Sequence, residues 1–194
     1  MLRTALARIS LLSQPATVAD WLAEQMRDQA PAGRQRPAWL AGRVLLAQLI
    51  HCRPLPVLHY HASGKPSFID TDLPAFNISH SGDFVFVAMD YCDDIGCDIE
   101  VIRERRGYLA LARHAFSPQE YRWLTLQLCE QRNDAFWRLW TAREAILKQR
   151  SASVWQMRTL ALEPETLSIT GSEVCHWREQ GVSISVARSR RGNP

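Results

Sequence analysis

The hydrophobic positions along the chain predict short strands and helices in alternation, with no internal repeat. Residues 1–12 alternate between apolar and polar side chains, as a strand does, whereas residues 17–29 carry apolar side chains at helical spacing. A second helix is predicted from Trp39 to Ile50. It ends before Arg53-Pro54, because the residue that precedes a proline avoids the helical conformation.

The middle of the chain predicts two strands joined by a tight turn. A polar segment, Phe76–Asp83, leads into the apolar run Phe84–Met89, and a second strand is predicted over Ile95–Ile102. Asp93 and Asp94 lie between the two strands and are typical of a hairpin turn. We therefore expect these two strands to pair.

Helices dominate the second half of the chain. They are predicted over residues 107–115, 118–129 and about 134–149, followed by short strands near 167–169 and 182–186. Ser117 and Pro118 suit the N-cap and the first helical position of the second of these helices. The whole pattern predicts an α+β fold with small antiparallel sheets. We place two packed halves at residues 1–103 and 104–188, joined near 103–107, and expect residues 189–194 to be disordered.

The composition is that of a globular protein with one ordinary domain or two small ones. The chain has 194 residues, of which 46% are hydrophobic and 22% charged. No apolar run approaches the roughly 18 residues of a membrane span, and Arg3 and Arg8 interrupt the apolar start. Five cysteines without a C-x-x-C pair predict free thiols rather than disulfides or a cysteine-only zinc site. We expect a cytoplasmic protein.

Charge is distributed unevenly along the chain. Residues 67–104 carry a net charge of −8, residues 1–66 one of +5, and residues 105–194 one of +6. A nucleic-acid-binding protein usually shows a basic stripe instead. Carboxylates in the middle suit a cation, and the basic flanks suit phosphates. Only two of the 23 basic residues are lysines, Lys65 and Lys148, and both fall within the motifs described next.

Two carboxylates share one face of the predicted strand Ile95–Ile102. Strand side chains alternate, so the apolar residues point to one face and Gly96, Asp98 and Glu100 to the other. Asp98 and Glu100 are then about 6–7 Å apart at Cα. Both can reach one hard cation, for which Gly96 leaves room, although a solvated strand face has the same pattern.

A third carboxylate lies on the long helix. Glu144 and Lys148 are four residues apart and therefore lie on one side of the helix, next to a heavily aromatic face that contains Phe136 and Trp140. This pair is either an ordinary helix ion pair, or Glu144 is a metal ligand and Lys148 a partner for phosphate. Ser79 and His80, which we expect at a strand edge after a buried Phe76, are groups that bind phosphate oxygens.

Taken in order, four motifs resemble those of the Sfp-type 4′-phosphopantetheinyl transferases. They are Gly64-Lys65-Pro66, Phe76–Ser81, Gly-x-Asp-Ile-Glu ending at Glu100, and Trp-Thr-x-x-Glu-Ala-x-x-Lys ending at Lys148. The resemblance covers about residues 36–150, and the residues within the motifs are most similar to those of the AcpT subgroup.

This resemblance implies a pseudo-dimeric α+β fold, with two similar halves and an active site in the cleft between them. The implied reaction moves the 4′-phosphopantetheinyl group of coenzyme A to a serine of an apo carrier protein and releases 3′,5′-ADP. Asp98, Glu100 and Glu144 would hold Mg²⁺. Glu144 would also take the proton of the serine, directly or through water, and Lys148 would neutralise the bridging phosphate oxygens.

The resemblance also implies contacts to coenzyme A from the basic N-terminal half. Ser79 and His80 would contact its phosphates, and the turn at Lys65 would lie near its adenine and 3′-phosphate. Arg36 and Arg43 are further candidates for phosphate contact. The implied partners are an apo-acyl carrier protein or carrier domain and coenzyme A, with no nucleic acid and no membrane. A pseudo-dimer needs no second subunit, so we expect a monomer.

The sequence departs from the family at two places. Arg143 precedes Glu144 where relatives often have lysine, and residues 149–154 replace a common Gly-x-Gly-Leu turn. Three other functions compete with the transferase. They are a Mg²⁺-dependent phosphohydrolase or nuclease that uses the same carboxylates, a family member that binds carriers without catalysis, and a metal-binding regulatory module built on His51, Cys52, His59 and His61.

Overall fold

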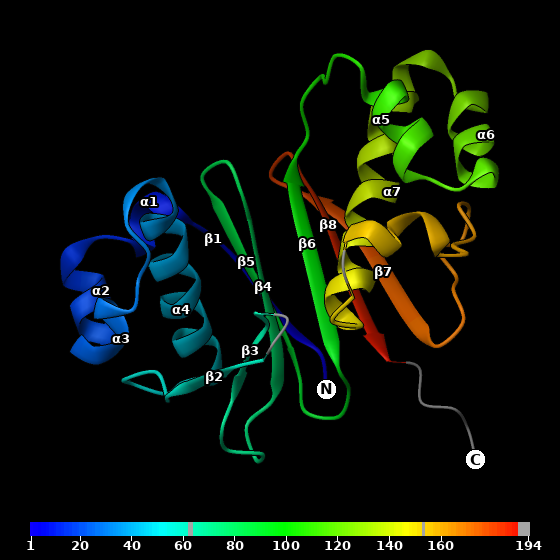
Figure 1. Cartoon of the computed structure of the whole chain (residues 1–194). Helices are drawn as coiled ribbons and strands as arrows, with labels where there is room; N and C mark the ends of the chain where they lie inside the picture. Colours follow the sequence, from blue (N-terminus) through cyan, green and yellow to red (C-terminus); the bar gives the residue numbers. More distant parts are fainter. Residues whose placement is uncertain (62–63, 153, 190–194) are drawn as a thin grey trace. The chain divides into compact units, whose positions relative to one another are not determined.

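Two compact units make up the chain, Met1–Cys92 and Asp93–Pro194. The computed structural model describes residues 1–61, 64–152 and 154–189. Each unit contains a three-stranded antiparallel sheet with a long helix packed on it (Figure 1). The expected α+β class is therefore confirmed. The units divide after Cys92 rather than after residue 103, so the strand that carries Asp98 belongs to the second unit.

Short helices and one long helix separate the strands of the first unit. In chain order its elements are β1 (Arg3–Arg8), α1 (Ile9–Leu12), α2 (Pro15–Trp21), α3 (Glu24–Asp28), η1 (Gly33–Gln35), α4 (Arg36–Ile50), β2 (Leu58–Tyr60), β3 (Pro66–Phe68), β4 (Ala75–Ser81) and β5 (Phe84–Asp90). The strand expected over residues 1–12 is shorter, and the helix expected over 17–29 is two helices. Leu22, at the break, has an extended backbone and is almost fully buried.

The first sheet has the order β1-β5-β4, and both neighbours of β5 are antiparallel to it. Helix α4 packs on the sheet, where Val44 and Leu46 join Val85, Val87 and Met89 in one core. Strand β4 contains Ser79 and His80 and lies at an edge of this sheet. A turn follows at Gly82, which has a φ of 58°.

The second unit places its helices between the first strand and a C-terminal hairpin. Its elements are β6 (Ile95–Val101), α5 (Tyr108–Ala115), α6 (Pro118–Leu126), α7 (Cys129–Gln149), η2 (Val154–Thr159), β7 (Ser172–Glu179) and β8 (Val182–Ser189). Helix α7 begins five residues earlier than expected. Strand β7 was missed, since the stretch expected at 167–169 forms only a single bridge, Ile169 to Ser172.

The predicted hairpin between β5 and β6 is wrong. Strand β6 pairs with β8 in a second sheet of order β6-β8-β7, while β5 is paired on both sides by β1 and β4. A strand with two hydrogen-bonded neighbours has no free edge for a third. Asp93 and Asp94 therefore begin the second unit instead of forming a tight turn.

Both units follow the same order of connections. In each, one strand is followed by helices, then by a long helix, and finally by a hairpin whose second strand takes the centre of the sheet. The long helices are α4 in the first unit and α7 in the second. No internal repeat of residues accompanies this repetition, because it concerns topology and not residue identity.

Helix α7 has two different faces. Phe136, Leu139 and Ile146 lie in an apolar core together with Phe116 and Leu124 from the segment of α5 and α6. The opposite side of the helix packs on β6 and β8. The N-terminus of α6 forms the expected cap at Ser117, as a capping box with Glu120. Within the described ranges, no helix combines the length and apolar character needed to cross a membrane.

Gly96 allows β6 and α7 to approach at backbone contact distance. A Cβ atom at this position would lie 2.1 Å from the carbonyl oxygen of Ala145 and 2.2 Å from the amide nitrogen of Gln149. Both atoms belong to the helix backbone, so no side-chain movement could relieve the clash. The absent side chain therefore makes room for the helix. The prediction that Gly96 leaves room for a bound cation is wrong.

We predict that Gly96→Ala lowers the free energy of unfolding by about 3 kcal/mol or more, because β6 and α7 must separate. Urea denaturation measures this loss. Gly181→Ala is the control, since Gly181 has open space around it and a φ of +76°. Its cost should be only the left-handed backbone strain, about 1–2 kcal/mol. Equal losses in the two variants would contradict the close packing of helix and strand.

Candidate active site

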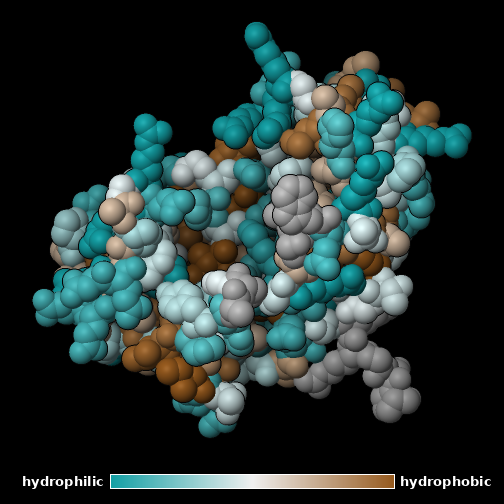
Figure 2. All heavy atoms as spheres, viewed as in Figure 1, coloured by the Kyte–Doolittle hydropathy of each residue, from teal (hydrophilic) through white to brown (hydrophobic). Residues whose placement is uncertain are grey.

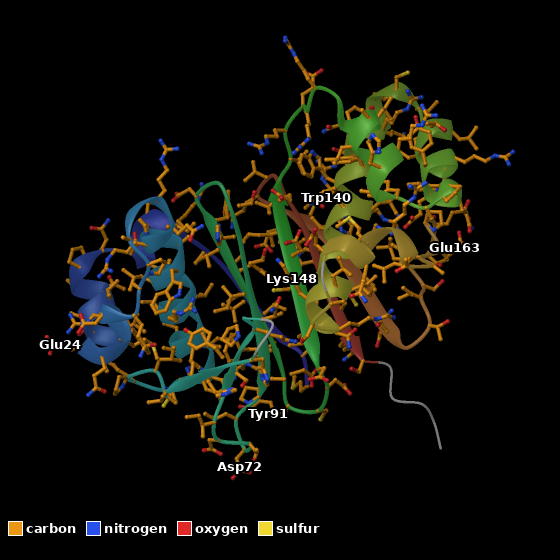
Figure 3. The ribbon with its side chains drawn as sticks, in the orientation of Figure 1. Glu24, Asp72, Tyr91, Trp140, Lys148 and Glu163 are labelled. Atoms are coloured by element: carbon orange, nitrogen blue, oxygen red, sulfur yellow. The ribbon has the colours of Figure 1, made fainter. Side chains whose placement is uncertain are left out.

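An ion pair joins the two elements that carry the predicted metal ligands. Lys148 on α7, which is labelled in Figure 3, donates from Nζ to Oδ1 of Asp98 on β6 at 2.7 Å. The Asp98 side chain is 8% exposed and that of Lys148 is 32% exposed. Burial is the largest single influence and lowers the pKa of Lys148, but the charges of Asp98, Cys97 and Glu144 and the hydrogen bond to Asp98 together outweigh it, so the net pKa is raised. Lys148 is thus held as a charged ammonium group beside a buried carboxylate.

Glu144 belongs to the same electrostatic cluster. Burial raises the pKa of Glu144, and repulsion from Asp98 and then Glu100 raises it further, whereas Lys148 lowers it. The three carboxylates are therefore close enough to repel one another. Glu144 and Lys148 do not form the isolated helix pair that their spacing allowed, because Lys148 also bonds across to the strand.

The donor set has the chemistry that Mg²⁺ requires. Asp98, Glu100 and Glu144 offer only carboxylate oxygens, the ligands that Mg²⁺ prefers in small number. A bound cation would remove the electrostatic repulsion among these carboxylates, which destabilises the folded chain. In the described part of the chain, however, no three His, Cys, Asp or Glu side chains already converge as metal ligands. The set fits the ion by its charge and donor type.

Arg143, the first departure from the family pattern, points away from this cluster. Its side chain is fully buried, and it donates to the Glu120 carboxylate and to the carbonyl of Met157. Burial lowers the pKa of Arg143, and the charge of Glu120 opposes that shift. Arg143 therefore links α7 to the capped end of α6 and to η2, and it is not placed to bind a phosphate.

The exit from α7, the second departure, is built without glycine. Ser151 takes a left-handed φ of 51°, a conformation in which glycine is usual. Gln149 bonds to the hydroxyls of Ser172 and Ser189, which ties the end of the helix to both strands of the C-terminal hairpin. Side-chain hydrogen bonds thus hold the helix end at this point.

A pocket of about 300 Å³ in the first unit contains two of the predicted coenzyme A residues. Its lining includes Arg43, His80, Trp39 and Pro66. The Arg43 guanidinium stacks on the Trp39 ring at 3.7 Å and donates to the hydroxyl of Tyr60 at 3.1 Å. Arg43 is 7% exposed, and none of the described residues accepts a hydrogen bond from its Nε.

Arg43 is consequently a buried cation without an acidic partner in the described chain. Burial lowers its pKa, and only the Tyr60 hydroxyl opposes that shift. A buried charge is costly unless it is paired. An anionic group in the pocket would supply the missing partner.

The other residues of the first unit that were predicted to contact coenzyme A do not all lie in this pocket. Ser79 is buried and His80 exposed, and as consecutive strand residues they project to opposite faces. Lys65 is half-buried and directly precedes Pro66 of the pocket. Arg36 lies apart, because it lines a different pocket of about 410 Å³ and donates to the carbonyls of Ala30 and Arg27. Arg36 therefore does not share the pocket of Arg43 and His80, and its contact to phosphate stays a prediction.

The structure gives no support to a zinc module in the first unit. His59 and His61 have ring centroids 5.2 Å apart, but His51 instead contacts Arg3. No metal-binding group that includes these residues or Cys52 occurs in the described ranges. All five cysteines are free, as expected from their number and spacing.

Several residues of the site escaped the sequence analysis. Trp39 could have been found, because it lies one turn before Arg43 on the same helix face. Tyr60 could not, because the contact depends on the β2–β3 hairpin. The buried hydroxyls of Thr141, Ser183 and Ser185 were missed as well, although the two serines alternate with apolar residues along their strand.

Comparison with known proteins agrees with the motifs. The family model described as the 4′-phosphopantetheinyl transferase superfamily matches residues 94–191. The 4′-phosphopantetheinyl transferase AcpT of Escherichia coli (strain K12) is 41% identical over 96% of this chain and 90% of its own length. AcpT of Salmonella typhimurium is 40% identical over 88% and 85%, and HetI of Nostoc is 31% identical over 74% and 63%. The chain belongs to the 4′-phosphopantetheinyl transferase superfamily.

We predict that Glu144→Gln is more stable than the wild type at pH 7 in metal-free buffer. The folded state raises the pKa of Glu144 above its ordinary value of 4.5, so the wild type loses stability as pH rises through 4.5. The variant has no such carboxylate, and the difference should vanish below pH 4.5. Urea denaturation between pH 4 and 8 with EDTA measures both trends.

The exposed Glu130 in the first turn of the same helix provides the control. Glu130→Gln should stay within about 0.5 kcal/mol of the wild type. A Glu144→Gln variant that is less stable than the wild type at pH 7 would show that the carboxylates do not repel one another.

Proposed function

We propose that this chain transfers the 4′-phosphopantetheinyl group of coenzyme A to a serine of an apo carrier protein and releases 3′,5′-ADP. The observation that carries the proposal is the cluster of Asp98, Glu100, Glu144 and Lys148, which folding assembles from two separate motifs. Relatives named as 4′-phosphopantetheinyl transferases match most of the chain. We also propose that the shared topology of the two units reflects a pseudo-dimeric fold.

Asp98, Glu100 and Glu144 are proposed to hold Mg²⁺. When bound, the ion would neutralise the pyrophosphate of coenzyme A and so favour departure of the nucleotide. Oxygen ligands, their number and their mutual repulsion support this assignment. The proton transfer and the stabilisation of the leaving group are proposed to depend on side chains.

Glu144 is proposed to act as the general base. The serine Oγ of the carrier bonds to the phosphorus that bears pantetheine, and the bond from that phosphorus to the bridging oxygen breaks. The serine proton passes to the Glu144 carboxylate, directly or through one water. A carboxylate held within reach of the serine hydroxyl is a suitable acceptor for this proton.

Lys148 is proposed to stabilise the leaving group. Its ammonium carries the positive charge that the departing bridging oxygen needs as its own negative charge grows. The ion pair with Asp98 keeps Lys148 charged and fixes its place on the strand side of α7. Because Lys148 is partly exposed, a substrate oxygen can still approach it.

Residues of the first unit are proposed to bind the nucleotide end of coenzyme A. Arg43 would pair with a phosphate, and the stacked Trp39 beside it gives the pocket an aromatic wall. His80 lines the same pocket, and Lys65 lies next to one of its lining residues. Ser79 stays in the proposed set as a contact to phosphate.

The proposed carrier partner suits the surface of the second unit. Figure 2 shows long hydrophilic side chains that project from the segment before α5 and from α6. Exposed arginines of this region include Arg105 and Arg106 before α5, Arg113 on α5 and Arg122 on α6. Exposed Leu126 and Leu128 lie at the end of α6. A basic surface with apolar contacts complements the acidic helices typical of carrier proteins.

We predict that Glu144→Gln lowers the rate of transfer by about 10²- to 10⁴-fold, because one substitution removes the proposed base and a metal ligand. The assay combines coenzyme A, Mg²⁺ and a panel of apo carriers of fatty-acid, polyketide and peptide type. Mass spectrometry then follows the gain of one phosphopantetheinyl group on each carrier.

Glu130→Gln is the matched control and should retain wild-type activity. Near-normal transfer by Glu144→Gln would contradict the role of this carboxylate. If the wild type modifies no carrier but hydrolyses simple phosphate esters with Mg²⁺, the phosphohydrolase interpretation replaces the transferase.

Arg43 provides a separate test of the nucleotide pocket. We predict that Arg43→Met raises the KM for coenzyme A about 10- to 100-fold, because a charged hydrogen bond to phosphate is lost, while kcat changes little. The control is Arg53→Met, which removes a guanidinium that also stacks on a tryptophan but is exposed and paired with Asp20. An unchanged KM in Arg43→Met would place the nucleotide elsewhere.

A further inference from the structure

A layer of hydroxyl groups lies buried between α7 and the sheet of the second unit. The Thr141 hydroxyl is 2.8 Å from that of Ser185 and 3.2 Å from that of Ser183. It also lies 3.0 Å from the carbonyl oxygen of Trp137, one turn earlier on the helix. Thr141, Ser183 and Ser185 are each at most 1% exposed. A polar contact of this kind is unusual at a helix–sheet interface, where apolar packing is the rule.

The imidazole of His176 completes this layer. Its Nδ1 lies 3.1 Å from the Ser185 hydroxyl on the neighbouring strand. If Nδ1 carries a hydrogen, it donates to Ser185, and both serines can donate to Thr141. Thr141 then donates to the helix carbonyl of Trp137 and, at 3.4 Å, to that of Arg138. In this arrangement every contact of the network is a hydrogen bond.

The surroundings of His176 keep its ring neutral at physiological pH. Burial lowers the pKa of His176 to about 4, and the nearby charges of Arg138 and Arg178 add to that effect. A neutral ring has one N–H, which on Nδ1 gives the arrangement above. The ring therefore adds no charge to the layer across the neutral pH range.

The hydroxyl layer lies beside the proposed catalytic residues in two directions. Along α7, Thr141 is three residues before Glu144 and seven before Lys148, so all three lie on one side of the helix. Across the sheet, Ser185 is the direct partner of Asp98, and Ser183 that of Glu100. Thr141 thus contacts the strand next to β6 at the level of both metal-binding carboxylates.

We propose that Thr141 is a positioning residue, whose hydroxyl fixes the rotation of α7 on β8 and thereby holds Glu144 and Lys148 over Asp98 and Glu100. The proposal rests on the proposed function, because it concerns the same carboxylates. Apolar packing alone sets the separation of helix and sheet but has little angular preference. Hydrogen bonds to two strand hydroxyls are directional, so they resist rotation of the helix about its axis.

Two variants of Thr141 separate its hydroxyl from its shape. Thr141→Val keeps the volume and removes the hydroxyl, whereas Thr141→Ser keeps the hydroxyl. We expect kcat to fall about 10- to 100-fold in Thr141→Val, as for other residues that orient metal ligands, with the KM for coenzyme A within about twofold. Thr141→Ser should restore kcat to within a few-fold of the wild type. Thr125→Val on α6 removes a similar helix hydroxyl bond and is the control.

A second readout does not depend on activity. The chain has only two lysines, so side-chain ¹³C labelling of lysine gives two signals, from Lys65 and Lys148. Thr141→Val should shift the signal of Lys148, because its distance to Asp98 changes, while Thr141→Ser and Thr125→Val leave it in place. If Thr141→Val does not fold, Ser185→Ala removes one bond of the network and should shift the same signal.

The outcomes distinguish this proposal from the function on which it rests. A shifted Lys148 signal in Thr141→Val, reversed in Thr141→Ser, supports positioning even if no carrier is modified by the wild type. An unchanged Lys148 signal together with unchanged kcat overturns it and leaves the transferase assignment intact. Equal loss of kcat in Thr141→Val and Thr141→Ser would also overturn it, because the hydroxyl would then not be the cause.

Discussion

The contact of α7 with β6 is the constraint on which the candidate site depends. At Gly96 the backbones of the helix and the strand meet without an intervening side chain. This approach brings Lys148 within hydrogen-bond distance of Asp98, and it places Glu144 where Asp98 and Glu100 repel it. The other face of α7 is anchored in the apolar core and through the buried Arg143–Glu120 pair. The helix is therefore fixed on both sides, and the charged cluster is assembled at the expense of stability.

The two units share a topology, but their long helices carry side chains that suit ligands of opposite charge. Each has a strand, a long helix and a hairpin in the same order. In the second unit the long helix places Glu144 and Lys148 beside the carboxylates of its sheet, which suits a cation. In the first, the long helix carries Arg43, a buried guanidinium stacked on Trp39, which suits an anion. This division agrees with the charge pattern of the sequence, in which an acidic stretch lies between basic ones.

Local chemistry was predictable from the sequence, and long-range pairing was not. The strand at Ile95, the cap at Ser117 and the nearness of Glu144 to Lys148 depend on neighbouring residues, and the structure bears them out. The hairpin at Asp93-Asp94 failed because the edges of β5 are taken by distant strands. Gly96 was misinterpreted for a similar reason, because its partner, the backbone of α7, becomes a neighbour only in the folded chain.

The central claim is that Asp98, Glu100 and Glu144 hold one divalent cation beside Lys148. Paramagnetic Mn²⁺ tests it directly, because it replaces Mg²⁺ at oxygen sites and broadens the signals of nearby nuclei. In protein labelled with ¹³C at its two lysines, small additions of Mn²⁺ should broaden the Lys148 side-chain signal, and excess Mg²⁺ should restore it. A Lys148 signal that stays sharp at stoichiometric Mn²⁺ would contradict the account.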